Sequence, residues 1–339
     1  MYKIALISDN LTASALEADA SLFHITPFNY WLMLKIVKPD ILLIESAWQG
    51  YKNTWKYKIA SYPDYQKRNN DKLVKVINYA KQLGIPTVFW NKEDSVHFHR
   101  FIDSAKHCDK IYTVDVNAVK LYQDVLGDTI PIDILPFPVQ PKLHYPFKSK
   151  NIIKRCSFVG SFSTHIHTIR RERQMMLFEA AQESGLDIFN RNSDRKNSVY
   201  SYPVLSDNMN IFPSIIPQET VKIYNDYIVN LNINTIEDSR TMYSRRLIEI
   251  IACESMAITT PAQSVEYNFK DFCYSISSKD EAKQHIDRIC MDGLSKSELD
   301  MLRSGREYVC TTFSYKKFLE TIMENIYNPH HLSHTKVVL

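Results

Sequence analysis

The chain has 339 residues, of which 45% are hydrophobic and 23% charged, and its net charge is +3. This composition is typical of a globular protein, and the length predicts two domains of roughly 150 residues each. The charge is too small and too evenly mixed to indicate nucleic-acid binding by itself, so nucleic acid is not expected as a partner.

The cysteines and the N-terminus indicate the cellular compartment of the protein. Six widely spaced cysteines without a CxxC pair predict free, mostly buried thiols in a reducing compartment. The first ten residues resemble a strand and not a signal peptide. No apolar run reaches the ~20 residues that a membrane-spanning helix needs. We expect a cytoplasmic protein, and peripheral contact with the inner membrane surface stays open.

Glycine is scarce, with 7 residues in the chain, whereas average proteins contain about 7%. Neither GxGxxG nor GxxxxGK[ST] occurs. The dinucleotide fingerprint and the P-loop are therefore excluded.

In the first part of the chain, short β-rich runs alternate with helical periodicity, as in a parallel sheet with helices on both faces. The expected strands span residues 3–8, 40–46, 86–90, 110–115 and 131–137, and the expected helices span residues 29–38, 71–84, 96–108 and 117–127.

Residues 136–151 hold four prolines without periodicity and are interpreted as a linker. The alternation then restarts, and the chain ends in two helices and a tail. The second set of expected strands spans residues 156–162, 186–191, 228–233, 256–261 and 272–277, and the expected helices span residues 169–185, 218–227, 242–255, 281–290, 297–313 and 314–327.

This pattern predicts an α/β fold of two doubly wound, Rossmann-like domains that face each other, followed by C-terminal helices. The expected limits are residues 1–145, residues 152–318, and a C-terminal helix and tail at residues 319–339. Ligands of such sheets bind outside the carboxyl ends of the strands, so the crevice between the domains is the expected site.

The segment SRRLIEIIACESMAITTP, from Ser244 to Pro261, combines an amphipathic helix with a strand. Arg246 and Glu249 are three residues apart and share one helical face. An intrahelical ion pair on a solvated face explains this spacing equally well.

The same segment resembles the nucleotide-sugar site of GT-B glycosyltransferases, in particular the family of the spore maturation protein CgeB. Arg246-Leu247-Ile248-Glu249 and Ala252-Cys253 match the family pattern, whereas Glu254 stands where the family usually has a glycine that supplies a left-handed helix cap. Other segments resemble the family in the same order over most of the chain: PDILLIESAWQG, PTVFWNKEDSVHFHRFIDSAKHCDKIYTVD, ILPFPVQPKLH, CSFVGSF and GREYVCTTFSY.

The resemblance implies that the C-terminal domain binds a nucleotide-sugar donor. Glu249 would accept hydrogen bonds from the ribose hydroxyls, and Arg246, with Arg245, would lie near the diphosphate. Backbone N–H groups of Gly160 and Ser161 would face the phosphates. Arg170 would extend this basic region, whereas the neighbouring Arg171 and Arg173 are better interpreted as a solvated helix surface.

No metal and no cofactor are expected, because the chain lacks the Asp-x-Asp motif by which another large class of glycosyltransferases holds a divalent ion. Arginines, lysines and helix N-termini would then offset the phosphate charge. His330, His331 and His334 are interpreted as part of a solvated terminus.

Polar residues follow three expected strands of the N-terminal domain, where parallel strands end and ligands bind. They are the expected acceptor-side residues: Asp9, Asn10, Glu45, Trp48, Asn91 and Lys92.

The stretch FWNKEDSVHFHRF, from Phe89 to Phe101, supplies the candidate catalytic residues. Glu93, followed by Asp94 and His97, is a candidate general base for an acceptor hydroxyl, and the alternative is that Glu93 only orients the acceptor. His97 and His99 are two residues apart, which is unsuitable for a shared metal on a helix. Asp94 or Ser95 would cap a helix that begins near Val96.

The sequence therefore predicts a hexosyltransferase-like enzyme of polysaccharide biosynthesis, which transfers sugar from a nucleotide diphosphate sugar to a saccharide, lipid-linked or other surface-glycan acceptor. Two alternatives stay open. One is a non-catalytic nucleotide- or glycan-binding module, and the other is a DNA-modifying glycosyltransferase.

Overall fold

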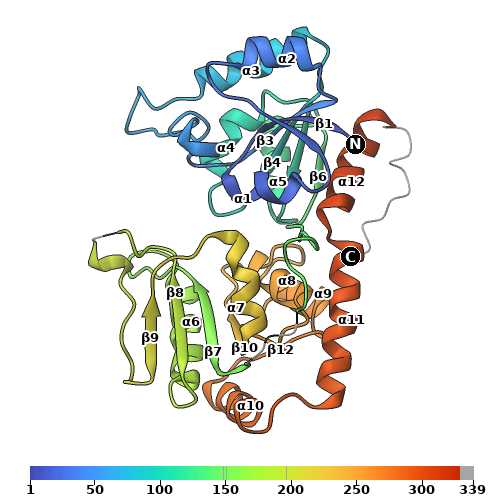
Figure 1. Cartoon of the computed structure of the whole chain (residues 1–339). Helices are drawn as coiled ribbons and strands as arrows, with labels where there is room; N and C mark the ends of the chain where they lie inside the picture. Colours follow the sequence, from blue (N-terminus) through green and yellow to red (C-terminus); the bar gives the residue numbers. More distant parts are fainter. Residues whose placement is uncertain (148, 150, 196, 329–339) are drawn as a thin grey trace. The chain divides into compact units, whose positions relative to one another are not determined.

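The computed structural model describes residues 1–147, 149, 151–195 and 197–328 (Figure 1). The chain forms two compact units. Unit 1 comprises Met1–Phe137 together with the C-terminal residues from Tyr315 onward, and unit 2 comprises Pro138–Ser314. The expected tail histidines, His330, His331 and His334, lie outside the described residues.

Unit 1 contains a six-stranded parallel sheet with the strand order β2-β1-β3-β4-β5-β6. Its elements are β1 (Lys3–Ile7), α1 (Asn10–Leu16), β2 (Ser21–His24), α2 (Tyr30–Val37), β3 (Ile41–Glu45), the 3-10 helix η1 (Tyr51–Asn53), α3 (Asp71–Gln82), β4 (Thr87–Asn91), α4 (Phe98–Ala105), β5 (Lys110–Thr113), α5 (Ala118–Leu126), β6 (Ile132–Ile134) and α12 (Tyr315–Tyr327).

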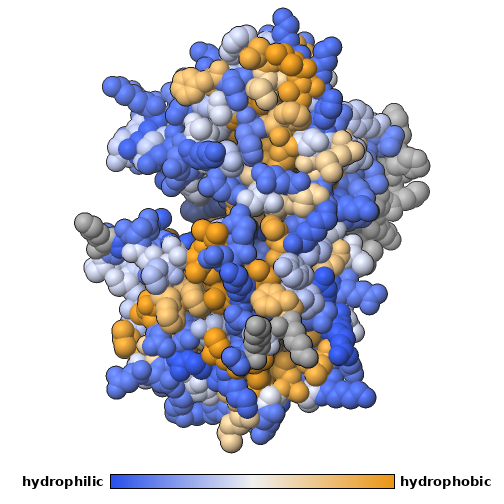
Figure 2. Space-filling model, viewed as in Figure 1, coloured by the Kyte–Doolittle hydropathy of each residue, from blue (hydrophilic) through white to orange (hydrophobic). Residues whose placement is uncertain are grey.

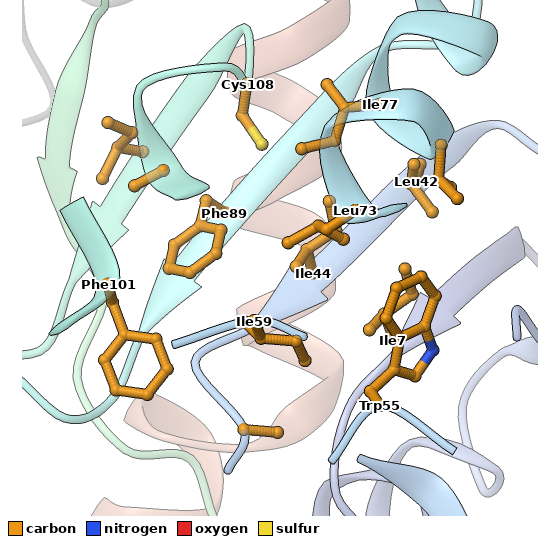
Figure 3. Packing of buried hydrophobic residues seen from close by; sticks show 14 of the residues in the cluster. Ile7, Leu42, Ile44, Trp55, Ile59, Leu73, Ile77, Phe89, Phe101 and Cys108 are labelled. Atoms are coloured by element: carbon orange, nitrogen blue, oxygen red, sulfur yellow. The ribbon is translucent and has the colours of Figure 1, made fainter. Parts of the chain in front are cut away.

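The core of unit 1 forms because the central strands are apolar on both faces, as parallel strands covered by helices must be. Figure 3 shows Leu73 and Ile77 of α3 packed beside Ile44 of β3 and Phe89 of β4. On the same side, the buried Trp55 donates from its indole nitrogen to the Ile25 carbonyl at 2.7 Å. Many buried polar side chains of this unit, such as Glu45, Asn91 and Thr113, lie at the strand ends.

Unit 2 repeats the architecture with the strand order β12-β11-β10-β7-β8-β9, and its pairings are also parallel. Its elements are β7 (Ile153–Gly160), α6 (Thr168–Ala181), β8 (Leu186–Asn190), η2 (Ser198–Tyr200), β9 (Met209–Phe212), η3 (Pro217–Glu219), α7 (Thr220–Asp226), β10 (Tyr227–Asn232), α8 (Arg245–Ala252), β11 (Ala257–Thr259), α9 (Gln263–Asn268), β12 (Tyr274–Ser275), α10 (Lys279–Asp292) and α11 (Lys296–Thr312).

The last helix, α12, returns to unit 1, although the sequence pattern placed residues up to 318 with the second domain and made residues 319–339 a separate piece. Phe318 packs edge-on against Trp90 with ring centroids 4.9 Å apart. Asn325 donates to the Tyr112 hydroxyl at 3.0 Å, and Tyr327 donates to the Asp40 carbonyl at 2.8 Å. These contacts join α12 to strands that lie more than two hundred positions earlier, which local sequence patterns do not reveal.

The expected linker is not a loose connection. Val139 forms a parallel bridge with Ser314, and His144 is buried. Phe147 donates its backbone N–H to the Asn225 side chain at 2.9 Å. The prolines prevent regular structure here, but the described part of the segment packs on unit 2 from Pro138 onward.

Most expected helices and strands occur near their expected positions. The unexpected elements are all short, and β2 and β9 are edge strands of the two sheets. They are α1, β2, β9, α9 and the 3-10 helices η1 and η2. Short edge strands need little apolar sequence because one side of the strand has no neighbour. The expectation of free cysteines is confirmed: all six are free and five are buried. No helix among the described residues is long and apolar enough to cross a bilayer.

Glu254 adopts the conformation that a glycine would supply at the end of α8. Its φ is +53°, its N–H donates to the Ile251 carbonyl, and the Ser255 N–H donates to the Ile250 carbonyl. This pair of bonds is a Schellman cap, which normally has glycine at the left-handed position. Arg306 also donates to the Ala252 carbonyl and lies 3.7 Å from the Glu254 carboxylate. The helix end is therefore kept without glycine, at the cost of backbone strain.

Replacing Glu254 by glycine should raise the free energy of unfolding by about 0.5–1 kcal/mol, because the left-handed strain is relieved and the partly exposed ion pair contributes little. Chemical denaturation measures the change. Glu254→Ala is the matched control, since it removes the same carboxylate but keeps a Cβ, and it should not be more stable than the parent. Equal stabilisation by both variants would contradict the backbone explanation.

Candidate functional site

In unit 2, the Arg246 side chain lies across the carboxyl ends of two neighbouring strands. Its Nε donates to the Val159 carbonyl at 2.6 Å, its Nη1 donates to Asn232 at 3.3 Å, and its guanidinium stacks 4.5 Å from the Phe158 ring centroid. A Cβ at Gly160 would come within 2.8 Å of the guanidinium Nη2. Gly160 is therefore required for the close approach of this arginine to the end of β7.

Two further arginines act electrostatically on Arg246. Arg170, on the first turn of α6, donates to the Ser161 carbonyl at 3.3 Å, and Arg191 directly follows β8 and donates its backbone N–H to the Gly160 carbonyl at 2.8 Å. Burial lowers the pKa of Arg246 to about 10, and the charges of Arg170 and Arg191 add to this effect. Burial and Arg191 likewise lower the pKa of Arg170. We call Arg170, Arg191 and Arg246 the arginine cluster.

The sequence predicts two members of this cluster, Arg170 and Arg246, as donor-binding residues, whereas Arg191 is not among the predicted residues. The sequence does contain a signal for Arg191, because it is the last residue of the strand predicted over residues 186–191. Ligands bind at the carboxyl ends of such strands. Gly160 and Ser161 lie at the end of β7, as expected. They are not part of the N-terminus of α6, because that helix begins at Thr168. The residues between them form a loop, and Arg170 reaches back over it to Ser161.

Glu249 pairs with Arg245 and not with Arg246, so the alternative explanation of their spacing, an Arg246–Glu249 ion pair, is wrong. The Arg245 Nε lies 2.9 Å from one carboxylate oxygen, and the Tyr224 hydroxyl donates to the other at 3.3 Å. His144 from the expected linker lies 3.9 Å from the same carboxylate. Burial alone would raise the pKa of Glu249, but Arg245 and the other nearby positive charges hold it below its ordinary value. Glu249 is therefore a buried, oriented anion.

In unit 1, the ends of three adjacent strands bring a lysine and two carboxylates together. Lys92 forms ion pairs with Asp9 and with the fully buried Glu45. Burial and the Asp9 charge raise the pKa of Glu45 to about 7. Asp9 also caps α1 by accepting from the Thr12 N–H at 2.9 Å. The expected acceptor-side residues Asp9, Glu45 and Lys92 are therefore brought into one cluster.

Asp94 is fully buried and is not a helix cap, because α4 begins at Phe98. Its carboxylate accepts from Asn91 at 2.7 Å, from Thr113 at 2.8 Å and from the Tyr122 hydroxyl at 2.9 Å. Burial is the main cause that raises the pKa of Asp94 to about 7, and the nearby carboxylate of Asp115 adds to the effect. Asp94 and Asn91 thus form a buried hydrogen-bonded network.

The remaining expected residues are more exposed or serve the local packing. Glu93 and His97 are partly exposed, with their carboxylate oxygen and ring nitrogen 4.0 Å apart. Trp48 packs edge-on against His97 and Phe101, each with ring centroids 5.1 Å away. Asn10 accepts from the Lys52 N–H at 3.1 Å.

Phe98, Phe101 and Ile102 are buried, whereas His99 is exposed. Within the described ranges, no group of three or more His, Cys, Asp or Glu residues is arranged to hold a metal ion. Metal independence stays a prediction.

Comparison with known proteins identifies the class of domain. Residues 171–324 match the model of a family described as glycosyl transferase-like. No curated protein sequence matches the chain.

Among solved structures, the chain is similar to three glycosyltransferase-related proteins. A glycosyltransferase from Rickettsia africae has a TM-score of 0.57 and 14% identity, with 96% of this chain and 99% of that chain covered. An alpha-glucosyltransferase in complex with UDP-glucose and DNA containing an abasic site has a TM-score of 0.65 and 11% identity, with 95% and 99% covered. Anabaena HepE in complex with UDP and glucose has a TM-score of 0.55 and 10% identity, with 96% and 91% covered.

The chain therefore contains a glycosyltransferase domain and has the GT-B fold of two Rossmann-like domains. The expected fold and the expected class of enzyme are confirmed. The finer resemblance to the CgeB family stays a prediction.

The raised pKa of Asp94 predicts a pH-dependent stability. The unfolded chain loses this proton near pH 3.8, whereas the folded protein keeps it until about pH 7. The stabilisation is therefore complete below the unfolded pKa and is lost as the pH rises to about 7, with a total of roughly 2–4 kcal/mol.

Asp94→Asn removes this titration, so its free energy of unfolding should rise relative to the parent between pH 4 and pH 7. Urea denaturation over this range provides the measurement, and Asp124→Asn on the exposed face of α5 is the control. Parallel pH profiles for the parent and Asp94→Asn would refute the raised pKa.

Proposed function

We propose that the protein is a metal-independent glycosyltransferase that takes a sugar from a nucleotide diphosphate sugar and transfers it to a saccharide, lipid-linked or other surface-glycan acceptor. The observation that carries this proposal is the arginine cluster at the carboxyl ends of β7, β8 and β10, on the same unit as the oriented carboxylate of Glu249.

The arginine cluster has the charge and chemistry for a diphosphate. Guanidinium groups bind phosphate oxygens with two parallel hydrogen bonds. The charges of Arg170 and Arg191 lower the pKa of Arg246, and the charge of Arg191 lowers the pKa of Arg170. Three such charges are unfavourable without an anion, and a diphosphate relieves this repulsion. When the bond between sugar and phosphate breaks, negative charge develops on the leaving nucleotide, and the same arginines stabilise it.

Glu249 is proposed to accept hydrogen bonds from the ribose hydroxyls of the donor. Arg245 and Tyr224 hold its carboxylate in one orientation and keep it ionised. A carboxylate has about four acceptor positions, so these two contacts leave capacity for ribose.

The acceptor is assigned to unit 1. Glu93 and His97 are the partly exposed members of the predicted catalytic group, and they are proposed to contact the acceptor hydroxyl. The Asp94 carboxylate is surrounded by three hydrogen-bond donors, one of which is the Asn91 side chain. Asn91 in turn accepts from the Glu93 N–H, so we propose that Asp94 holds Glu93 in position through Asn91. Whether Glu93 removes a proton or orients the acceptor is decided by the pH dependence of its glutamine variant.

A second candidate acceptor is DNA. Two solved structures similar to this chain are alpha-glucosyltransferases in complex with DNA. In unit 1, residues 51–68 include five lysine or arginine residues, one aspartate and several tyrosines, and Arg68 stacks over the rings of Tyr57 and Tyr65. Basic and aromatic side chains together suit nucleic acid. Electrophoretic mobility with duplex DNA at moderate salt separates this candidate from a glycan acceptor.

The proposed setting is the cytoplasm. Its support is the set of six free cysteines, five of them buried, which fits a reducing compartment. Cell fractionation with an antibody against the chain tests this location.

The donor is identified by a screen of UDP, GDP, CDP and ADP sugars, in which released nucleotide is detected by mass. We expect release with one class of donor. If the protein binds nucleotide sugars but releases no nucleotide, either with sugar acceptors or with DNA present, a non-catalytic binding module would be favoured instead.

Arg191→Ala should weaken binding of the matching nucleoside diphosphate by about ten- to a hundredfold, since a charge-assisted hydrogen bond to phosphate contributes roughly 1.5–3 kcal/mol. Calorimetry measures the dissociation constant. Arg195→Ala is the matched control, because Arg195 is also exposed on the same loop but stacks on Tyr200. Equal affinities for the two variants would remove Arg191 from the site.

Glu249→Gln keeps the side-chain shape and should reduce nucleotide release at least tenfold, while thermal unfolding shows whether the variant is folded. Full activity in a folded Glu249→Gln protein would refute the role of this carboxylate in donor binding.

A further inference from the structure

Helix α2 of unit 1 presents apolar side chains to solvent. Phe28, just before the helix, is 82% exposed, and Trp31, Leu32 and Ile36 are 55%, 42% and 68% exposed. Figure 2 shows apolar residues gathered at the top of this view, where Figure 1 places α2. Single exposed apolar residues are common, but a group of four large ones on one short segment marks an interaction surface. We call Phe28, Trp31, Leu32 and Ile36 the α2 patch.

The opposite face of α2 is held firmly, so the α2 patch cannot turn inward. Leu34 is fully buried. Tyr79 of α3 donates its hydroxyl to the Trp31 carbonyl at 3.2 Å, and its ring packs edge-on against Tyr30 with centroids 5.7 Å apart. The helix is therefore a fixed element with one face packed on α3 and one apolar face outward.

The charges around the α2 patch are mainly positive. Helix α2 contains Lys35, is followed directly by Lys38, and has no acidic residue. On α3, Lys72 lies 5.1 Å from the Tyr30 ring centroid, and Lys75 follows one turn later toward Tyr79. Asp71 is the acidic residue at the start of α3. Lys35 and Lys38 thus lie on the segment of the α2 patch, and Lys72 and Lys75 lie on the adjacent helix α3. The acidic residues close by in the chain are Asp71 and Asp40, and the Asp40 carboxylate accepts from the Lys3 N–H at 2.7 Å.

We propose that the α2 patch docks on a membrane surface that contains anionic lipids. Aromatic and aliphatic side chains of an interfacial helix enter the boundary between headgroups and acyl chains, while lysines extend to the phosphates. Each lysine near such a surface adds attraction, which salt screens. This inference goes beyond the proposed function and does not depend on it.

A second copy of the chain is a weaker occupant. The α2 patch exposes a few hundred Å², on the order of what two or three large side chains bury, whereas a stable dimer needs about 800 Å² from each partner. The lysines would also face lysines in a symmetric pair, which is repulsive. Charge and size both favour an anionic lipid surface.

Cosedimentation of the full chain with vesicles tests the proposal. The parent protein should bind vesicles of equal parts phosphatidylglycerol and phosphatidylcholine more tightly than vesicles of phosphatidylcholine alone, and added salt should weaken binding. The double variant Trp31→Glu with Ile36→Glu should lower the apparent partition coefficient at least tenfold. The pair Lys35→Glu with Lys38→Glu should remove the preference for phosphatidylglycerol.

Val125→Glu is the matched control. Val125 is 57% exposed on α5 of the same unit, where Asp124 precedes it, and the variant should bind vesicles like the parent. Circular dichroism checks that each variant is folded, and nucleotide release without vesicles should be unchanged, which separates this proposal from the proposed function.

Three results would overturn the proposal. One is a parent protein that does not bind the phosphatidylglycerol vesicles at low salt, and another is a folded α2 double variant that binds like Val125→Glu. The third is a parent dimer in size-exclusion chromatography that the α2 variants dissociate while vesicle binding is unaffected, which assigns the patch to a second copy.

Discussion

A parallel sheet that helices cover on both faces leaves the strand ends as the place for polar chemistry. Both units obey this constraint. In unit 1 the ends of β1, β3 and β4 bring Asp9, Glu45 and Lys92 together, and in unit 2 the ends of β7, β8 and β10 bring Gly160, Arg191 and Asn232 around Arg246. The candidate site residues follow from this arrangement.

The two sets of strand ends differ in their charge balance. In unit 1, the positive charge of Lys92 is paired with two carboxylates. Because the pKa of Glu45 is raised to about 7, this carboxylate can take up a proton near neutral pH, and the net charge of the cluster then stays close to zero. In unit 2, Arg246 and its arginine neighbours donate to carbonyl and amide oxygens and repel one another. The cluster of unit 1 is thus balanced by its own charges, whereas the arginine cluster of unit 2 is the part that we propose to bind a diphosphate.

The chain contains few glycines, so each position that has one shows where the fold needs it. Gly160 is needed because a Cβ would collide with Phe158 and Arg246. At the end of α8, by contrast, Glu254 takes the left-handed conformation, and Arg306 supports the helix end. The chain therefore has glycine at position 160, where no side chain fits, whereas at position 254 a glutamate adopts the left-handed conformation.

The sequence by itself determined the two α/β units, the free cysteines and most strand ends, because apolar periodicity and the residues after each strand are local properties. For this reason the sequence predicts several of the candidate site residues, namely Arg246, Glu249, Glu45 and Lys92. Tertiary structure alone decided which partners they have. Glu249 pairs with Arg245, Tyr224 and a histidine from a proline-rich segment, and α12 returns to unit 1. The Arg245–Glu249 pair is local, because the two residues are four positions apart on α8. The other contacts join residues far apart in the chain, and their geometry depends on packing that no local pattern encodes.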